Sequence, residues 1–280
     1  MAYAHIVKPG SKVRYKDLDP DYHAGLEKEE AEFRRHELGT NVEELQDLMY
    51  AASKNSLLLV FQGSDTSGKD GSIKGILQFV NVQSCRVSSF KQPSAIEMSH
   101  DFLWRIHSQA PALGGMSIFN RSHYEDVLVV RVHNLVPKDV WKGRYDQINQ
   151  FEKLLTDSGT IILKFFLHIS KEEQEKRLVA REENADKSWK LSVADWRERE
   201  FWKDYQKAYE DVLEKCSTEY APWHVVPSNN KWFRDLAIME SIENALKPYK
   251  KDWHEQLRQT GVERKKELEE FRKKMNIKPE

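Results

Sequence analysis

The feature that most constrains how this chain can fold is a glycine-rich segment at residues 62–71, QGSDTSGKDG. The segment follows the short apolar run LLLVF at 57–61 and opens a stretch with helical spacing from 69 to 80. It contains the full pattern G-x-x-x-x-G-K, in which glycines let backbone N–H groups converge on phosphate oxygens and the lysine neutralises phosphate charge. A strand, this loop and a helix in that order predict a phosphate-binding loop. The alternative is an ordinary glycine-rich turn with a surface lysine.

Two carboxylates in this segment depart from the common motif. Asp70 stands directly after Lys69, where a Ser or Thr usually ligates Mg²⁺. It either belongs to the phosphate site or favours the first helical turn and pairs with Lys74 four residues on. Asp65 lies inside the loop, where a carboxylate repels phosphate unless a divalent cation bridges the two, so we predict a metal-site residue there. The residues predicted to bind phosphate in this segment and the helix that follows it are Gly63, Ser64, Thr66, Ser67, Gly68, Asp70, Gly71 and Lys74.

The rest of the chain alternates short apolar runs with helical spacing, after about 20 polar and irregular residues. This alternation predicts a parallel sheet flanked by helices, the α/β class. Strands are expected at 57–61, 86–90, 116–119, 160–168 and 223–226. Helices are expected at 28–52 (one or two), 69–80, 96–107, 145–155, 171–216 with a break near 184, and 233–246, with a short helix after the strand at 116–119.

A second motif, NRSHYED at 120–126, lies where the third predicted strand ends. Ligands of open α/β sheets bind at the carboxyl ends of the strands. Ser122 and Glu125 have the spacing of a capping box, which favours a structural role for that pair. A capping box does not require Arg121, which we predict to point at a transferring phosphoryl group. Asp126 lies one residue beyond the box and is predicted to complete the metal site.

The segment 171–190 contains six basic and six acidic residues. One interpretation is a solvated helix in which Glu173 pairs with Arg177. The other is a lid that brings cations such as Arg177 and Arg181 over the phosphates and excludes water. The position after a core strand in a phosphate-loop fold favours the lid.

Composition excludes several classes of protein. The net charge is −1, from 44 basic against 45 acidic residues, so the chain lacks the basic field that nucleic acid requires. The longest apolar runs fall far short of the roughly 20 residues that span a bilayer, and no signal peptide is expected in the first ten residues. Two cysteines exclude a disulfide scaffold and favour a reducing cytoplasm.

Four segments in this order resemble the second family of polyphosphate kinases. They are GSDTSGKDG at 63–71, NRSHYED at 120–126, the basic stretch from Arg177 through Arg181 to KSWK at 187–190, and APWHVVP at 221–227. The resemblance extends from about Lys8 to Tyr249 and leaves the charged tail uncovered. That tail is expected to be a helix that is either solvated or in contact with another subunit.

The resemblance implies a three-layer α/β/α sandwich like that of thymidylate kinase, with a helical lid at about 177–205. It predicts three parts: an N-terminal extension at 1–52, a phosphotransferase core at 53–248 and a C-terminal helix at 249–280. It also implies phosphoryl transfer between inorganic polyphosphate and adenine or other purine nucleotides in a homo-oligomer. The cofactor implied is Mg²⁺, with Mn²⁺ as an alternative.

Residue by residue, the resemblance assigns catalysis to Asp65, Lys69, Asn120 and Arg121, and a metal ion to Asp65 and Asp126. The lid cations implied to bind phosphate are Arg177, Arg181, Lys187 and Lys190. Many members have Asp-Arg-Ser where this chain has Asn120-Arg-Ser, which is similar to the subgroup that phosphorylates both AMP and ADP. Two other functions stay open at this point: an ATP-dependent nucleoside monophosphate kinase and a nucleotide-binding regulator without turnover.

Overall fold

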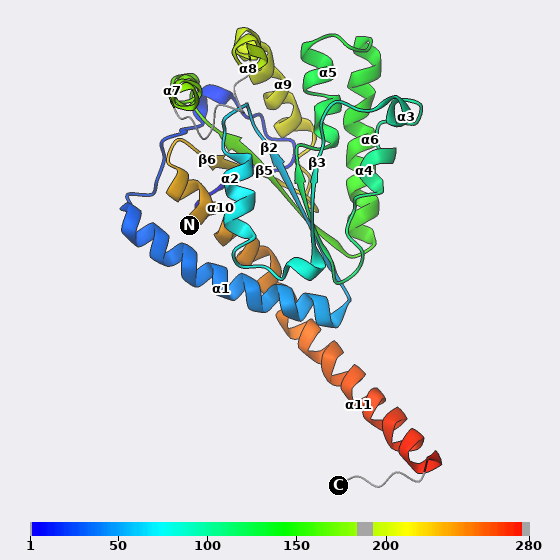
Figure 1. Ribbon diagram of the computed structural model, residues 1–280. Coiled ribbons are helices and arrows are strands. Elements are labelled where there is room, and N and C mark those ends of the chain that lie inside the picture. The colour runs from blue at the N-terminus through cyan, green and yellow to red at the C-terminus, as the bar shows by residue number, and fades with distance from the viewer. Residues whose placement is uncertain (1, 184–192, 276–280) are drawn as a thin grey trace.

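A mostly parallel sheet forms the centre of the molecule (Figure 1). The structure is a computed structural model that describes residues 2–183 and 193–275. In this part of the chain six strands pair in the order β1-β6-β5-β2-β4-β3. They are β1 (His5–Ile6), β2 (Ser56–Gln62), β3 (Cys85–Ser89), β4 (Met116–Asn120), β5 (Thr160–His168) and β6 (Trp223–Pro227). Only the pairing of β1 with β6 is antiparallel among them.

Strand β2 shows why the sheet needs a layer on each side. All seven of its residues are buried, and successive side chains point to opposite faces. Leu57, Leu59 and Phe61 pack in one core with α1 (Lys28–Ala52), α2 (Lys69–Ile76) and α10 (Lys231–Leu246). Leu58 and Val60 pack in the other core with α5 (Val129–Val132), α6 (Lys138–Asp157) and α9 (Trp202–Lys215). The predicted three-layer α/β/α fold is confirmed.

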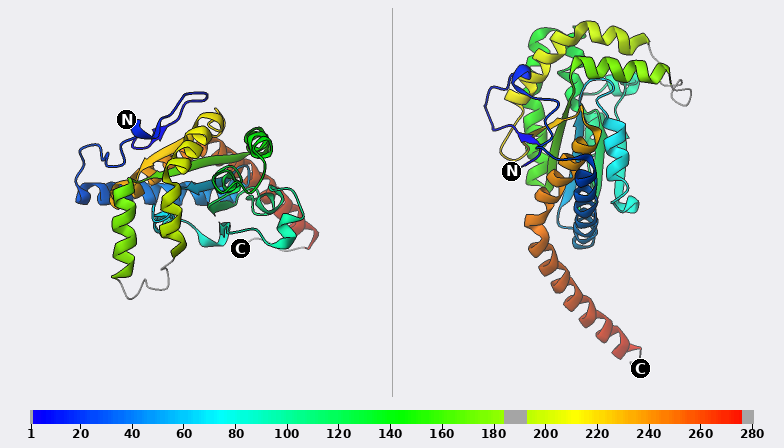
Figure 2. Two further views of the ribbon diagram at one scale, coloured as in Figure 1. Left: turned by 90° about the horizontal axis from the view of Figure 1, so that it is seen from above. Right: turned by 90° about the vertical axis from the view of Figure 1, so that its left-hand side faces the viewer.

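The remaining elements are short, with two exceptions. The short helices are α3 (Ala95–Met98), α4 (Trp104–His107) and α8 (Val193–Glu198), and the 3₁₀ turns are η1 (Tyr15–Asp17), η2 (Val82–Ser84), η3 (His123–Asp126), η5 (Arg199–Phe201) and η6 (Lys247–Tyr249). Helix α7 (Lys171–Glu182) runs beside α8, and the two helices project from the body (Figure 2). Helix α11 (Lys250–Lys274) leaves the opposite end of the molecule (Figure 1).

The predicted strands are confirmed to within a residue or two, and the segment 28–52 is one helix. The single helix predicted at 96–107 is wrong, because two short helices lie there. The Asp101 carboxylate accepts a hydrogen bond from the Leu103 N–H at 3.0 Å and starts a new turn. The Ser99 hydroxyl donates to the Ile96 carbonyl at 2.7 Å where the first helix ends. Strand β1 was not predicted, since its two residues carry no detectable alternation.

Within the described residues, no helix is both long and apolar enough to cross a bilayer. The break predicted near 184 falls in the segment 184–192, which lies outside the described residues together with Lys187 and Lys190.

Candidate active site

The phosphate-binding loop joins β2 to α2 at the carboxyl end of the sheet. Helix α2 begins at Lys69, whose ammonium donates hydrogen bonds to the carbonyls of Gly63 at 2.8 Å and Ser64 at 3.1 Å. Burial lowers the pKa of Lys69 to about 8, assisted by the charge of Arg121 and opposed by that of Asp65. The Lys69 side chain thus folds back over the loop, so its ammonium lies where it can bind a phosphate held by the loop.

Three hydroxyls of the loop have no hydrogen-bond partner in the described part of the chain. They belong to Ser64, Thr66 and Ser67, and all three oxygens are buried. Buried polar groups in proteins are normally paired, so three unpaired hydroxyls in one loop indicate a polar ligand. Together with Lys69 and the start of α2, they suit the oxygens of a phosphate group.

The loop can adopt this shape only with glycine at two positions. Gly63 has φ +154°, and a Cβ there would lie 2.8 Å from the Leu167 carbonyl oxygen. Gly68 has φ +107°, and a Cβ there would lie 1.8 Å from the guanidinium of Arg234. The second close approach shows that Arg234 packs directly against the loop.

Arg234 is a site residue that the sequence analysis missed. It lies in the first turn of α10, and its Nε and Nη2 atoms bind the carboxylate of Asp235 at 2.8 and 3.0 Å. The pattern at 233–246 was interpreted only as a core helix. No local signal marks Arg234, which lies well beyond the end of β6.

Arg121 follows β4 in a left-handed backbone conformation, with φ +62°. Its N–H still donates to the Phe61 carbonyl at 3.0 Å, so the pairing with β2 continues into the turn. Its guanidinium binds the carboxylates of Asp65 at 2.8 Å and Glu125 at 3.3 Å. These charges, Glu125 first and then Asp65, raise the pKa of Arg121 above its usual value against the opposing effect of burial.

The capping box predicted for Ser122 and Glu125 is wrong. The Ser122 hydroxyl accepts a hydrogen bond from the Tyr124 N–H at 3.2 Å and another from the Gln62 amide at 3.0 Å. The segment forms the 3₁₀ turn η3, whose tighter geometry brings the second residue after Ser122 to its hydroxyl. Glu125 is thereby left to pair with Arg121 in the site.

Asp126 lines neither of the cavities that Asp65 lines, although the two were predicted to share a metal ion. Its carboxylate binds the guanidinium of Arg144 at 2.9 Å. Burial raises the pKa of Asp126, and the charge of Arg144 opposes that rise. A metal role for Asp126 stays a prediction. Glu125 and Glu198, by contrast, line the same cavity as Asp65.

Asn120 and Asp70 contact each other across the mouth of the loop. The Asn120 amide donates to the Asp70 carboxylate at 2.8 Å, which links the end of β4 to the start of α2. Both residues, like Gly71, line the basic cavity beside the loop. Lys74 is exposed on α2 and lines a neighbouring groove instead.

The two predicted lid arginines in the described part of the chain have different places. Arg177 is buried, and it donates to the carbonyls of Thr66 at 2.9 Å and Ser228 at 2.6 Å as well as to Glu173 at 2.7 Å. Its guanidinium therefore stabilises the loop through hydrogen bonds to backbone carbonyls. Burial lowers the pKa of Arg177. Arg181 lines the basic cavity and binds Asp195 of α8 at 2.9 Å.

Two cavities meet at Asp65 and Arg121. The larger, of about 530 Å³, has seven basic side chains and two carboxylates in its wall. We call it the basic cavity; its basic residues are Lys69, Lys91, Arg121, Arg177, Arg181, Lys231 and Arg234. The smaller, of about 50 Å³, we call the aromatic cavity, since Tyr15, Trp202, Tyr205 and Tyr209 line it. The sequence analysis missed Tyr15 because the first 20 residues have no periodic pattern.

The pKa of Lys69 predicts a pH dependence. Below about pH 8 the ammonium is charged and neutralises a bound phosphate; above it the free protein loses that charge. We expect kcat/KM for the phosphate donor to fall above pH 8, approaching tenfold for each pH unit. The Lys69→Arg variant keeps its charge at all these pH values, so it should lose this fall. A profile that is identical in both proteins would contradict the assignment.

The fold and this site define a phosphate-loop kinase: a parallel sheet, a glycine-rich loop with its lysine, an arginine at the end of the neighbouring strand, and a pair of projecting helices. The family model "Polyphosphate kinase 2 (PPK2)" matches residues 25–254. The chain belongs to this family, and the resemblance seen in its motifs is confirmed.

Individual relatives cover nearly the whole chain. It is 46% identical over 242 residues to the AMP/ADP-polyphosphate phosphotransferase of Meiothermus ruber, covering 86% of this chain and 91% of that protein. It is 42% identical to the ADP-polyphosphate phosphotransferase of Rhodopseudomonas palustris, covering 92% and 91%. The crystal structure of polyphosphate kinase 2 from Arthrobacter aurescens TC1 is 39% identical, with a TM-score of 0.83 over 89% of this chain and 92% of that one.

Proposed function

We propose that this protein transfers the terminal phosphoryl group of inorganic polyphosphate to AMP and to ADP, forming ADP and ATP. The observation that carries the proposal is the loop itself. Three of its buried hydroxyls have no hydrogen-bond partner among the described residues, and they lie in the loop that Lys69 closes, where Asp65 and Arg121 line both cavities. The family membership and the activities after which the relatives are named support the same reaction.

The basic cavity suits a polyanionic donor. Its wall has seven basic side chains against the carboxylates of Asp65 and Asp70, so a chain of phosphates would be largely neutralised along it. The aromatic cavity lies on the other side of Arg121, and aromatic rings stack on nucleobases, so we assign the acceptor to that side, where the cavity of about 50 Å³ must widen to admit base and ribose. The acceptor phosphate would then meet the donor at Arg121.

The reaction needs no protein nucleophile. An oxygen of the acceptor phosphate attacks the terminal phosphorus in line, a new P–O bond forms, and the bridging P–O bond to the chain breaks. The polyphosphate leaves one unit shorter, with the bridging oxygen as part of its new terminal phosphate. Lys69 and Arg121 stabilise the charge on the transferring group, and Arg177 keeps the loop in shape.

Magnesium fits this site as an ion that binds together with phosphate. Among the described residues, no three His, Cys, Asp or Glu side chains gather so as to hold a metal by themselves. The Asp65 carboxylate lies where both cavities meet, and phosphate oxygens complete the oxygen set that Mg²⁺ prefers. Asp65 would therefore hold the ion, which when bound neutralises phosphate charge.

One assay separates this proposal from its rivals. Protein, Mg²⁺, AMP and long-chain polyphosphate are mixed without ATP, and the nucleotides are separated by anion-exchange chromatography. Formation of ADP and then ATP is expected. Turnover only after ATP is added would indicate a nucleoside monophosphate kinase, and nucleotide binding without any turnover would indicate a regulator.

Asn120 provides a test of acceptor choice. In the Asn120→Asp variant two carboxylates would face each other where the Asn120 amide now donates to Asp70. We expect the ratio of kcat/KM for AMP to that for ADP to fall by about tenfold, the scale of one altered hydrogen bond to a charged group. The kcat/KM for AMP should fall more than that for ADP, because AMP has only one phosphate with which to reach the donor.

The Asn120→Ala variant removes the same hydrogen bond without adding charge, and it serves as the matched control. Initial rates with each acceptor at saturating polyphosphate provide the measurement. Equal losses for AMP and ADP, or no loss, would show that Asn120 does not set acceptor choice.

We further infer that the protein is a cytoplasmic homo-oligomer. Helix α11 extends from the body and exposes Leu268 and Phe271, three residues apart on its surface, as a self-associating helix would. Light scattering of the full chain should give a mass that is a multiple of the chain mass. A monomer at assay concentrations would contradict the inference.

A further inference from the structure

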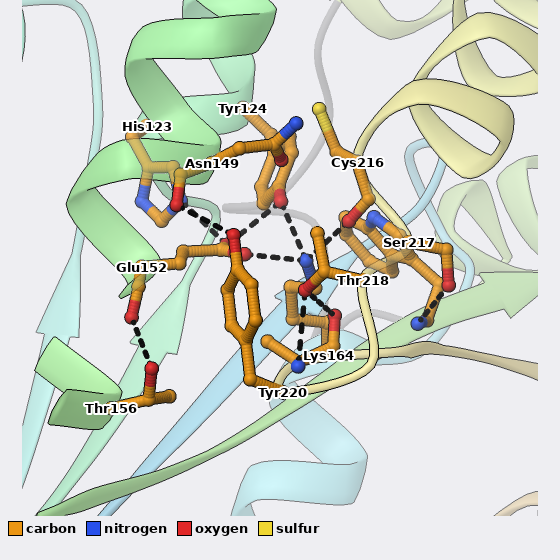
Figure 3. Close-up of polar contacts among 12 residues, drawn as sticks. His123, Tyr124, Asn149, Glu152, Thr156, Lys164, Cys216, Ser217, Thr218 and Tyr220 are labelled. Atoms are coloured by element: carbon orange, nitrogen blue, oxygen red, sulfur yellow. Dashed lines mark hydrogen bonds and ion pairs between the residues drawn. The ribbon is translucent and has the colours of Figure 1, made fainter. Parts of the chain in front are cut away.

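A buried charged network of Glu152 and Lys164 contacts His123 and Tyr124, the first two residues of η3 (Figure 3). Glu152 of α6 and Lys164 of β5 are both fully buried, and the Lys164 ammonium binds the Glu152 carboxylate at 2.6 Å. The ammonium also donates to the Tyr124 hydroxyl at 2.9 Å and to the Cys216 carbonyl at 2.6 Å. The Lys164 ammonium therefore has three oxygen partners, as many as its three N–H donors can serve.

The network binds η3 through two successive residues, His123 and Tyr124. Tyr124 donates its hydroxyl proton to the Glu152 carboxylate at 2.7 Å, and the His123 ring nitrogen Nε2 lies 3.1 Å from the same oxygen. Both side chains are fully buried. The lysine holds the pKa of the Glu152 carboxyl below its usual value against the effect of burial, with His123 assisting. An ionised carboxylate is thus available to fix both His123 and Tyr124.

The opposite side of the same turn faces the active site. Arg121 precedes this pair by two residues, and Glu125 directly follows it and binds the Arg121 guanidinium at 3.3 Å. Arg121 holds a left-handed conformation that costs a non-glycine residue on the order of 1 kcal/mol or more, so its surroundings must impose it. The contacts of the network with His123 and Tyr124 hold the turn directly after Arg121 on its buried side.

Stability alone does not explain a buried ion pair at this place. Desolvating two charges offsets most of their attraction, and apolar residues of similar volume are often as stable. The pair also interrupts an otherwise apolar core: Ile162 and Phe166, on either side of Lys164 along β5, belong to the hydrophobic cluster on this face. A role in fixing one conformation of η3 accounts for its presence.

We propose that Glu152 and Lys164 are positioning residues for phosphoryl transfer: through His123 and Tyr124 they fix η3 and thereby hold the Arg121 guanidinium between Asp65 and Glu125. The inference rests on the proposed function for its kinetic consequences, whereas the hold on η3 is a property of the protein alone.

The first test replaces the pair by apolar side chains. The Glu152→Leu, Lys164→Met double variant should unfold at a temperature close to that of the native protein, yet its kcat should fall by about tenfold or more, since small misplacements of a catalytic group cost this much. The KM for polyphosphate should change little, because the phosphate loop lies on β2 and α2. Leu155→Ala, which removes core packing from the same helix, is the control and should lose stability but not kcat.

The second test asks whether the effect passes through Arg121. Tyr124→Phe removes the hydroxyl that bridges Glu152 and Lys164 while keeping the ion pair and the ring, so it folds even if the double variant does not. Its loss in kcat should be severalfold in the native background and should vanish in the Arg121→Ala background, as expected for residues that act as one unit. Equal losses in both backgrounds, or a folded double variant with native kcat, would overturn the proposal.

A third measurement does not depend on turnover. Amide hydrogen exchange should become faster at 121–126 in the Tyr124→Phe variant, while exchange in the loop at 63–71 stays unchanged. Unchanged exchange at 121–126 would overturn the proposal whatever reaction the protein performs. Native protein without turnover would contradict the proposed function and leave this third result to decide the inference.

Discussion

Replacing Arg121 by alanine is expected to lower kcat for phosphoryl transfer from polyphosphate by about 10²–10³, the scale for one charge contact made in the transition state. The guanidinium lies between the Asp65 and Glu125 carboxylates at the meeting of the two cavities. As the transferring group loosens, charge spreads over its oxygens, and a guanidinium can bind two of them at once. Steady-state rates at saturating AMP and polyphosphate provide the measurement.

The Arg121→Lys variant should recover only part of this loss, because an ammonium has charge but not the planar fork. Arg131→Ala is a matched control: this arginine is also partly buried and paired, but with Asp211 on α9. It should keep kcat near that of the native protein. An Arg121→Ala variant with near-native turnover would remove Arg121 from the mechanism.

The Lys69→Ala variant is expected to lose kcat on the same scale, about 10²–10³. Its ammonium now binds the carbonyls of Gly63 and Ser64 and is available to exchange them for phosphate oxygens. The fold should survive, because the variant removes a charge whose burial already lowers its pKa to about 8. Thermal unfolding measured beside kcat separates the two effects.

Lys142→Ala, which removes an exposed charge from α6, is the control for net charge. It should leave both kcat and the unfolding temperature close to native. If Lys69→Ala retained native kcat and KM, the loop would not be the site of transfer, and the glycine-rich turn would be only structural.

The sequence predicted those parts of the fold that local pattern determines. A fully buried strand has a short apolar run, and a phosphate loop has glycines at fixed spacing, so β2, the loop and α2 could be recognised without neighbours. The helix predicted at 96–107 failed because the side chains of Ser99 and Asp101 bind the backbone and split it. The spacing of apolar residues does not show where side chains compete with the helix for backbone hydrogen bonds.

Several parts of the site that depend on tertiary contacts were not predicted. Arg177 has the spacing of a lid cation, yet in the folded protein its guanidinium binds carbonyls of the loop. Arg234 and Tyr15 reach the site from distant segments, and no local pattern marks either residue. In the sequence, Lys164 is distinguished only as a charged residue within an apolar strand. Its partner Glu152 lies on a helix in which the spacing of apolar residues does not distinguish it from the other charged residues.

The most direct test of the central claim follows the phosphoryl group itself. Native protein is incubated with Mg²⁺, unlabelled AMP and radiolabelled polyphosphate, with all ADP and ATP removed beforehand, and the nucleotides are separated after a single turnover. We expect label in ADP at a rate that the Arg121→Ala variant lowers by about 10²–10³. ADP that remains unlabelled, or labelling at the same rate in both proteins, would contradict direct transfer from polyphosphate at this site.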